Sequence, residues 1–186
     1  EFDDFINYQE IADTASRLVN DGESIMLTSG IINQFIARAL TERTGISIVT
    51  NDFQIALNFS SSPDNCLIFL GGDLDDKAVY GQMTLDNLRN FSFDHVFIEV
   101  DGLHEINGVT VNSTKKATLI QKAAALSESV NLVCLSKNIG SRSLYRVGKL
   151  DMASRIITDS KLDDSYKQLI YHHKIPLFTS IDVYEN

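Results

Sequence analysis

The chain has 186 residues, of which 44% are hydrophobic and 22% are charged, a composition typical of a globular domain with a buried core. No apolar run approaches the roughly 20 residues that a membrane helix needs, so neither a disordered chain nor a membrane protein is indicated. The formal net charge of -9 argues against direct binding of nucleic-acid phosphates, which requires clustered lysines and arginines. We expect one domain over residues 1–186, because no linker or low-complexity tract divides the chain.

The cysteines and the first residues bear on where the protein works. Cys66 and Cys134 lie inside apolar runs, so we expect both to be buried core residues, with no disulfide framework and no metal site. Free thiols and an acidic start without signal-peptide character favour the cytoplasm. Because the chain does not begin with Met, we expect it to be part of a longer protein that includes an N-terminal partner domain.

Short runs rich in β-branched residues alternate with segments of helical spacing. The opening segment is predicted to be helical up to Gly22, because Ile11, Ala15, Leu18 and Val19 repeat at three and four residues. Strands are then predicted over residues 24–28, 46–50, 67–70, 96–100, 130–135, 155–158 and 175–179, and helices over 32–43, 53–59 and 114–128. The alternation predicts an open α/β fold with a largely parallel sheet and helices on both faces.

Polar residues and glycines follow four of the predicted strands. In an open α/β sheet, ligands bind beyond the carboxyl ends of the strands, so these residues are expected to meet at one edge. They are Thr28, Ser29 and Gly30 after the first strand, Thr50 and Asn51 after the second, Gly71 and Gly72 after the third, and Asp101 and Gly102 after the fourth. Their convergence predicts a pocket for a polar ligand.

Each strand end also has a plainer interpretation. Thr28 or Ser29 could cap the following helix, and Asn51 or Asp52 could cap the next one. The hydroxyls and the backbone N–H groups around Gly30 could instead bind an anion such as phosphate. The residues alone leave both interpretations open.

The motifs of several other sites are missing. No Gly-x-Gly-x-x-Gly follows the first strand and no Gly-Lys-Ser/Thr P-loop occurs, so dinucleotide and ATP sites lose support and no cofactor is expected. His172 and His173 are adjacent, have no cysteine nearby and are expected at the surface. His104 is of the kind found in polar loops, although a role as general base stays open.

The order and spacing of these residues resemble the C-terminal sensor domain of the DeoR family of sugar-catabolism repressors. The resemblance spans essentially the whole chain and rests on the segments 11–13, 21–30, 48–51, 55–57, 70–72, 81, 101–102, 108–110, 138–144 and 156–159. It implies the fold of ribose-5-phosphate isomerase and coenzyme A transferases, with strand-end loops that hold a phosphorylated sugar. It also implies a homo-oligomer, dimer or tetramer, whose operator binding resides in an N-terminal winged helix-turn-helix outside this chain.

The resemblance assigns the effector site to Thr28, Ser29, Gly30, Ile31, Thr50, Asn51, Gly71, Gly72, Asp101, Gly102, Lys116 and Lys137. Where the family usually reads Asp-Ser-Gly-Thr-Thr, this chain has Ile31 and Ile32 at the last two positions, which removes two hydroxyl groups. Where the family reads Asp-Ser-Ser-Lys-Phe-Gly, Leu135 and Asn138 stand at the Asp and Lys positions, so Lys137 could substitute by a shift of one residue. Lys116 stands where the family often has acids, and it could serve an anionic ligand or simply face solvent.

The leading interpretation is a non-enzymatic effector-binding and oligomerisation domain of a DeoR-type transcriptional repressor that senses a phosphorylated sugar or a related metabolite. The alternative from another class is a sugar-phosphate isomerase of the same fold, with Asp101, Glu105 and Lys137 as candidate acid–base groups. A third possibility is an assembly domain whose effector site has decayed, which Ile31 and Leu135 slightly favour. Ligand binding separates the sensor from the assembly domain, and turnover separates the isomerase from both.

Overall fold

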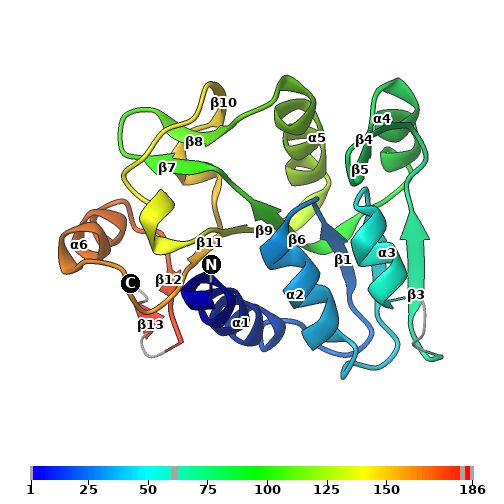
Figure 1. Ribbon diagram of the computed structural model, residues 1–186, viewed down its shortest axis with the longest axis horizontal. Helices are drawn as coiled ribbons and strands as arrows, with labels where there is room; N and C mark the ends of the chain where they lie inside the picture. The colour runs from blue at the N-terminus through cyan, green and yellow to red at the C-terminus, as the bar shows by residue number, and fades with distance from the viewer. Residues whose placement is uncertain (1, 60–62, 181–182, 185–186) are drawn as a thin grey trace.

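The computed structural model describes residues 2–59, 63–180 and 183–184 of the chain, and its centre is an eight-stranded sheet (Figure 1). The strand order is β13-β12-β11-β9-β6-β1-β2-β3. In chain order the strands are β1 (Ser24–Leu27), β2 (Ser47–Thr50), β3 (Cys66–Phe69), β6 (Phe93–Glu99), β9 (Ser127–Val133), β11 (Arg155–Ile157), β12 (Leu177–Phe178) and β13 (Val183–Tyr184). All neighbours pair in parallel except β12 and β13, which are antiparallel, so the largely parallel sheet is confirmed.

Helices cover both faces of the sheet, as predicted (Figure 1). One face carries α1 (Phe2–Ser16), α2 (Ile31–Leu40) and α3 (Phe53–Phe59), and the other carries α4 (Gln82–Leu88), α5 (Thr114–Ala125) and α6 (Asp164–His172). None of the described helices is long and apolar enough to cross a membrane.

The alternation of side chains along β1 shows why the sheet is covered twice. Ile25 and Leu27 pack into the core beneath α1 and α2, whereas Met26 between them packs into the core on the α5 side. All three side chains are fully buried. A strand buried on both faces is apolar at successive positions, which is the pattern that the sequence shows here.

Short elements outside the main sheet were not predicted. They are the hairpin β4 (Asp73–Asp75) and β5 (Ala78–Tyr80), the antiparallel sheet formed by β7 (Gly102–His104), β8 (Gly108–Val111) and β10 (Tyr145–Gly148), the helix α4, and the 3-10 turns η1 (Ser136–Asn138) and η2 (Leu150–Met152). Their strands have three or four residues, too few for a period to be recognised.

The predicted ends were wrong for three helices, and the helix predicted over residues 32–43 ends at Leu40. The first helix was predicted to reach Gly22 but ends at Ser16, because the N–H groups of Leu18 and Val19 turn to carbonyls three residues back and tighten the chain. Gly22 instead takes a positive φ of 81° in the turn into β1. The helix predicted over residues 114–128 ends at Ala125, since Leu126 leaves helical geometry and β9 begins directly after it.

The prediction for the cysteines was half right. Cys134 is fully buried, as expected, and both described thiols are free. Cys66 is exposed, because β3 is the edge strand of the sheet and part of it stays uncovered. An apolar run on an edge strand looks the same in sequence as one in the centre of a sheet.

Candidate functional site

Neighbouring strands end beside the first turn of α2. In the sheet β1 lies between β2 and β6, so the residues that follow these three strands share one edge. The backbone N–H of Ser29 donates to Oδ1 of Asn51 over 3.1 Å, and the Ser29 hydroxyl donates to Oδ2 of Asp52 over 2.8 Å. The predicted meeting of the first two strand ends is therefore present.

Several polar groups at this edge serve the fold itself. The Thr50 hydroxyl donates to the carbonyl of Leu27 over 2.7 Å, and both Thr28 and Thr50 are buried. Asp52 caps α3, because its Oδ1 accepts the N–H groups of Gln54 at 2.7 Å and Ile55 at 3.1 Å. The interpretation as a helix cap thus holds for Asp52, whereas Thr28 and Ser29 make no side-chain cap on α2.

The cap of α2 comes from Glu99, a residue that the sequence reasoning missed. Its Oε2 accepts the backbone N–H groups of Ile32 at 2.8 Å and Asn33 at 3.3 Å. A Cβ atom on Gly30 would overlap the Glu99 carboxylate, so glycine is required for this approach. The available signal was an acid at the end of an otherwise apolar strand, Val96–Val100.

The environment of Glu99 changes its acidity. Burial raises the pKa of its carboxyl from 4.5 to about 7, and this effect outweighs the N–H groups of Asn33 and Ile32 and the charge of Lys116, all of which lower it. A carboxyl with this pKa changes its charge near neutral pH. It therefore combines a structural role with a titration that few surface acids show.

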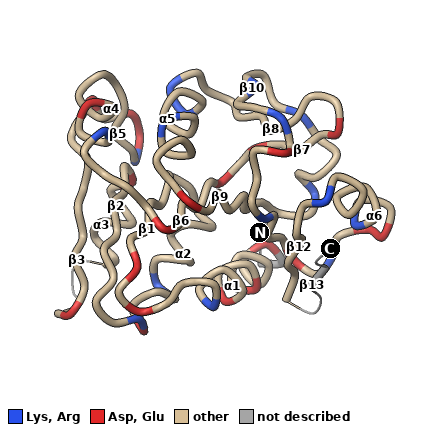
Figure 2. The backbone as a smooth tube through the Cα atoms, turned by 180° about the vertical axis from the view of Figure 1, so that it is seen from behind, with Lys and Arg blue, Asp and Glu red and all other residues tan. Residues whose placement is uncertain are grey.

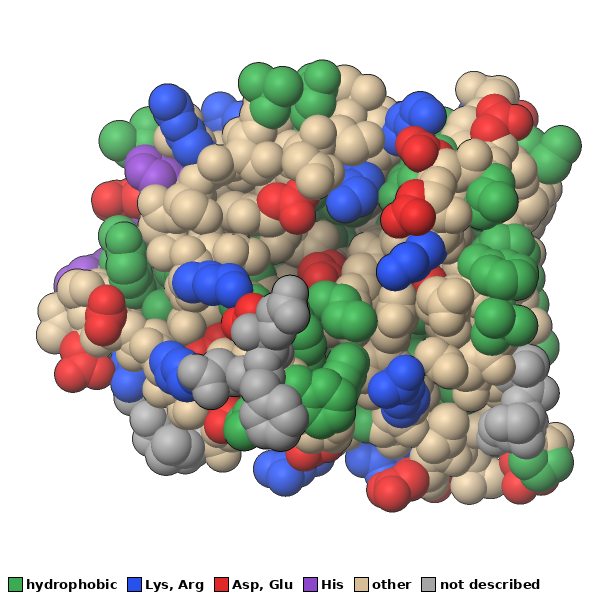
Figure 3. All heavy atoms as spheres, viewed as in Figure 1, with side chains coloured by type: hydrophobic (Ala, Val, Ile, Leu, Met, Phe, Trp, Pro, Cys, Tyr) green, Lys and Arg blue, Asp and Glu red, His purple; other side chains and the backbone are tan. Residues whose placement is uncertain are grey.

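A cavity of about 390 Å³ opens beside these strand ends, and we call it the edge cavity. It is lined by Ser29, Gly30, Ile31, Gln34, Asp52, Asp75, Asp76, Lys77, Ala78, Tyr80, Asn112, Ser113 and Lys116. The view in Figure 3 has a hollow near the centre of the face, with acidic and basic side chains around it. Of the predicted site residues, Ser29, Gly30, Ile31 and Lys116 line the edge cavity.

Charges of both signs surround the edge cavity. Asp75 forms an exposed ion pair with Lys115 over 3.1 Å, whereas Lys77 and Lys116 make no ion pair within the described part of the chain. Burial raises the pKa of the Tyr80 hydroxyl, although hydrogen bonds with Asn51 and Ser29 oppose that effect. Hydroxyl, amide, carboxylate and ammonium groups therefore face one space.

The remaining predicted residues are not brought into the edge cavity. The Gly71 carbonyl accepts the hydroxyl of Thr84 over 2.7 Å, and Gly72 packs against the same Thr84, so both glycines lie under α4. Gly102 packs against Ser141 and Thr110 in the small sheet. Thr28, Thr50 and Asn51 are buried behind the cavity.

The candidate acid–base groups of an isomerase lie in separate surroundings. Oδ2 of Asp101 accepts the backbone N–H of Asn112 over 2.8 Å. Lys137 pairs with Asp4 of α1 at 3.0 Å, and Glu105 lies 3.9 Å from His173. No described contact joins the three candidates.

His104, His172 and His173 lie at a turn or at the surface. His104 closes the turn after β7, because its Nδ1 faces the N–H groups of Ile106 at 3.1 Å and Asn107 at 3.3 Å. His172 and His173 are exposed. Among the described residues, no group of three or more His, Cys, Asp or Glu could hold a metal ion.

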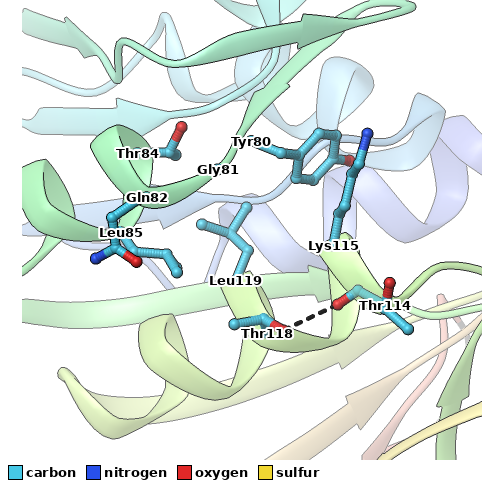
Figure 4. A pocket seen from close by; sticks show the side chains of 9 residues that line it. All are labelled: Tyr80, Gly81, Gln82, Thr84, Leu85, Thr114, Lys115, Thr118 and Leu119. Carbon is cyan, nitrogen blue, oxygen red and sulfur yellow. Dashed lines mark hydrogen bonds between the residues drawn. The ribbon is translucent and has the colours of Figure 1, made fainter.

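A second cavity, of about 230 Å³, lies between α4 and α5 and shares Tyr80 with the edge cavity (Figure 4). Leu85 and Leu119 line it, and the Thr118 hydroxyl is already bonded to the carbonyl of Thr114 over 3.0 Å. With fewer free polar groups, it offers a ligand less specific recognition. We therefore place the candidate site in the edge cavity.

Comparison with known proteins identifies a family that this chain matches. The family model described as the DeoR C terminal sensor domain matches residues 7–160. The putative aga operon transcriptional repressor of Escherichia coli O157:H7 is 26% identical over 153 residues, which cover 81% of this chain and 57% of that protein. The glycerol-3-phosphate regulon repressor of Escherichia coli strain K12 is 23% identical over 171 residues, covering 91% of this chain and 68% of that protein. The chain thus spans only part of the length of these relatives.

Solved structures share the fold. Ribose 5-phosphate isomerase A from Methanocaldococcus jannaschii aligns with a TM-score of 0.52 at 15% identity, over 71% of this chain and 53% of that chain. The delta subunit of eIF2B from Chaetomium thermophilum aligns with a TM-score of 0.59 at 15% identity, over 82% of this chain and 55% of that chain. At this level of identity the likeness shows the architecture and says nothing of activity.

Proposed function

Since the chain belongs to the family of DeoR C-terminal sensor domains, we propose that it is the effector-binding part of a transcriptional repressor and that its edge cavity binds a phosphorylated sugar. Operator DNA would be bound by a winged helix-turn-helix domain outside this chain, within a homo-oligomer. The two relatives described above are named as transcriptional repressors, which supports a regulatory role over an enzymatic one.

The observation that carries the proposal is the lining of the edge cavity. Its volume, about 390 Å³, falls within the range of roughly 300–1,000 Å³ that is usual for small-molecule sites. Gln34, Asn112 and Ser113 offer the amide and hydroxyl groups that bind sugar hydroxyls. The position at the carboxyl ends of the strands is where open α/β sheets bind ligands.

Two lysines that line the edge cavity suit a phosphate. Lys116 lies in the first turn of α5, a helix whose first turn carries no acidic residue and whose N-cap, Ser113, makes no side-chain cap bond. The partial positive charge of a helix N-terminus adds to that of the lysine. Lys77 lines the same cavity, and neither lysine has an ion pair in the described residues.

A thermal-shift screen tests the proposal. Phosphorylated sugars are compared with their unphosphorylated parents, because a ligand at about 100 times its Kd adds about 2.7 kcal/mol to the free energy of unfolding. We expect one or a few phosphosugars to stabilise the chain, and Lys116→Ala to remove the shift. Lys122→Ala, in the last turn of the same helix, is the matched control and should leave the shift intact.

Two results would contradict the proposal. If no phosphosugar in the panel stabilises the chain, phosphorylated sugars are not its ligands, and an assembly domain is favoured. Conversion of a sugar phosphate by the chain, seen by NMR of the product mixture, would favour the isomerase alternative.

A further inference from the structure

The first turn of α2 already holds an anion that belongs to the protein. The opening N–H groups of a helix have no partner within the helix and attract negative charge. Here the N–H groups of Ile32 and Asn33 are both engaged by Oε2 of Glu99, at 2.8 Å and 3.3 Å. The carboxylate therefore occupies the place where a bound phosphate would be expected.

The surrounding carboxylates disfavour a second anion at this turn. Gly30 lies directly against the Glu99 side chain, which fills the space that a Cβ would take. Asp52 stands on the other side, because its Oδ2 accepts the N–H of Gly30 at 3.3 Å and the hydroxyl of Ser29 at 2.8 Å. A phosphate at the start of α2 would face two carboxylates at close range.

The positive charge lies on the opposite wall of the edge cavity. Lys116 belongs to α5, on the other face of the sheet from α2, and it is near enough to Glu99 to lower the pKa of that carboxyl. Of the charged groups around the cavity, Asp52 lies beside α2 and Lys116 belongs to α5, while Asp75 of the β4–β5 hairpin is already paired with Lys115 of α5.

We propose that Glu99 determines the specificity of this site by closing the start of α2 to anionic groups, so that the phosphate of a ligand is directed to Lys116. The orientation of the ligand rests on the proposed function. The closure of the α2 turn by Glu99 stands independently of it.

Inorganic phosphate, followed through backbone amide signals in ¹⁵N NMR spectra, tests the closure directly. In the unaltered chain we expect no saturable shift at Ile32 or Asn33, and saturable shifts at Ser113 to Lys116. In Glu99→Gly the same titration should give saturable shifts at Ile32 and Asn33, with an affinity at least about tenfold above any residual binding at these amides in the unaltered chain, because a like charge has been removed.

A second variant guards against misfolding. Glu99→Gln keeps the shape of the side chain and an oxygen acceptor but removes the charge, so we expect a smaller gain in phosphate affinity at the same two amides. The dispersion of the NMR spectrum reports whether each variant is folded. Phosphate binding at Ile32 and Asn33 that is equally strong in the unaltered chain and in a folded variant would overturn the proposal.

The two proposals fail in different ways. If no phosphosugar binds but Glu99→Gly gains phosphate binding, the sensor function is wrong and the closure holds. If a phosphosugar binds the unaltered chain through Ile32 and Asn33 and Lys116→Ala leaves its affinity unchanged, the role of Glu99 is wrong and the sensor function holds.

Discussion

The Glu99 carboxyl has a pKa of about 7 in the folded chain and an ordinary value of 4.5, so burial makes folding sensitive to pH. An acid with a raised pKa contributes its full stability below the unfolded value and loses it as the pH rises through the folded value. For Glu99 that loss runs from about pH 4.5 to about pH 7 and beyond. The protein is therefore expected to lose stability through one identifiable side chain as the solution approaches neutrality.

Glu99→Gln should remove this pH dependence. Between about pH 5 and pH 8 we expect the free energy of unfolding of the unaltered chain to fall relative to that of the variant, by at most about 3 kcal/mol, at about 1.4 kcal/mol per pKa unit. Urea unfolding at both pH values measures the difference. If the free energy of unfolding changes with pH by the same amount in both proteins, Glu99 titrates with an ordinary pKa.

The site residues that sequence reasoning placed in the cavity were those beside a regular element. Ser29 and Gly30 follow directly from the end of β1, whereas Ile31 and Lys116 were assigned through the resemblance and also line the cavity. Lys137 was assigned through the resemblance, and the structure pairs it with Asp4, far along the sequence. Glu99 was missed because its contact with α2 crosses 67 residues of sequence and depends on the packing of β6 against β1.

At the scale of single elements, Asn33 ties α2 to the sheet. Its Nδ2 donates to the carbonyl of Thr28 at 2.7 Å and to that of Phe97 at 2.9 Å, and the side chain is fully buried. One amide group thus connects a helix with the ends of two neighbouring strands. The turn that carries Ser29 and Gly30 is fixed by the same contacts.

Asn33→Ala is expected to lower the free energy of unfolding by about 1–3 kcal/mol, because it leaves a buried carbonyl without its donor. Urea unfolding measures the change. Gln34→Ala, at the next position of α2, has no described side-chain hydrogen bond and should change stability by less than about 0.5 kcal/mol. If both variants lose the same free energy of unfolding, the loss comes from helix propensity and not from the hydrogen bonds of the Asn33 side chain.

The elements that could be predicted are those with a clear period. Strands such as β1 and β2 carry consecutive apolar residues because both of their faces are covered, and α2 and α3 follow them with helical spacing. The small sheet of β7, β8 and β10 could not be predicted, since β10 pairs with β8 across more than 30 residues of sequence. Helix ends could not be predicted either, because the geometry of Leu126 depends on the strand that begins after it.

For the whole molecule, the charge distribution sets the expected behaviour towards DNA. The net charge is -9, and in Figure 2 lysines and arginines are spread among acidic residues along the chain. Binding to duplex DNA depends on clustered positive charge that releases counterions from the phosphates. The helix α5 carries three lysines and no acid, but Lys115 is paired with Asp75 and the chain as a whole has an acidic excess.

We therefore expect this chain alone not to bind duplex DNA at physiological salt. Fluorescence anisotropy of a labelled duplex, titrated with the chain at micromolar concentrations, measures this, with a basic DNA-binding domain as positive control. A saturable rise in anisotropy that weakens with added salt would show that the chain contributes directly to DNA contacts.

Fold class was accessible from sequence because the βα alternation extends over nearly the whole chain. The strand order was not accessible in the same way, since the sequence shows which segments are strands but not that β6 inserts between β1 and β9. The comparisons with ribose 5-phosphate isomerase and eIF2B support the architecture, at sequence identities too low for any single residue to be transferred.

The unequal exposure of the two cysteines gives the protein a natural attachment point. Cys134 is fully buried and burial raises the pKa of its thiol, which suppresses the reactive thiolate. Cys66 is exposed on the outermost strand. A maleimide dye would therefore mark one known position on the rim of the sheet in the unaltered chain, and its emission would report on any molecule that docks along that rim.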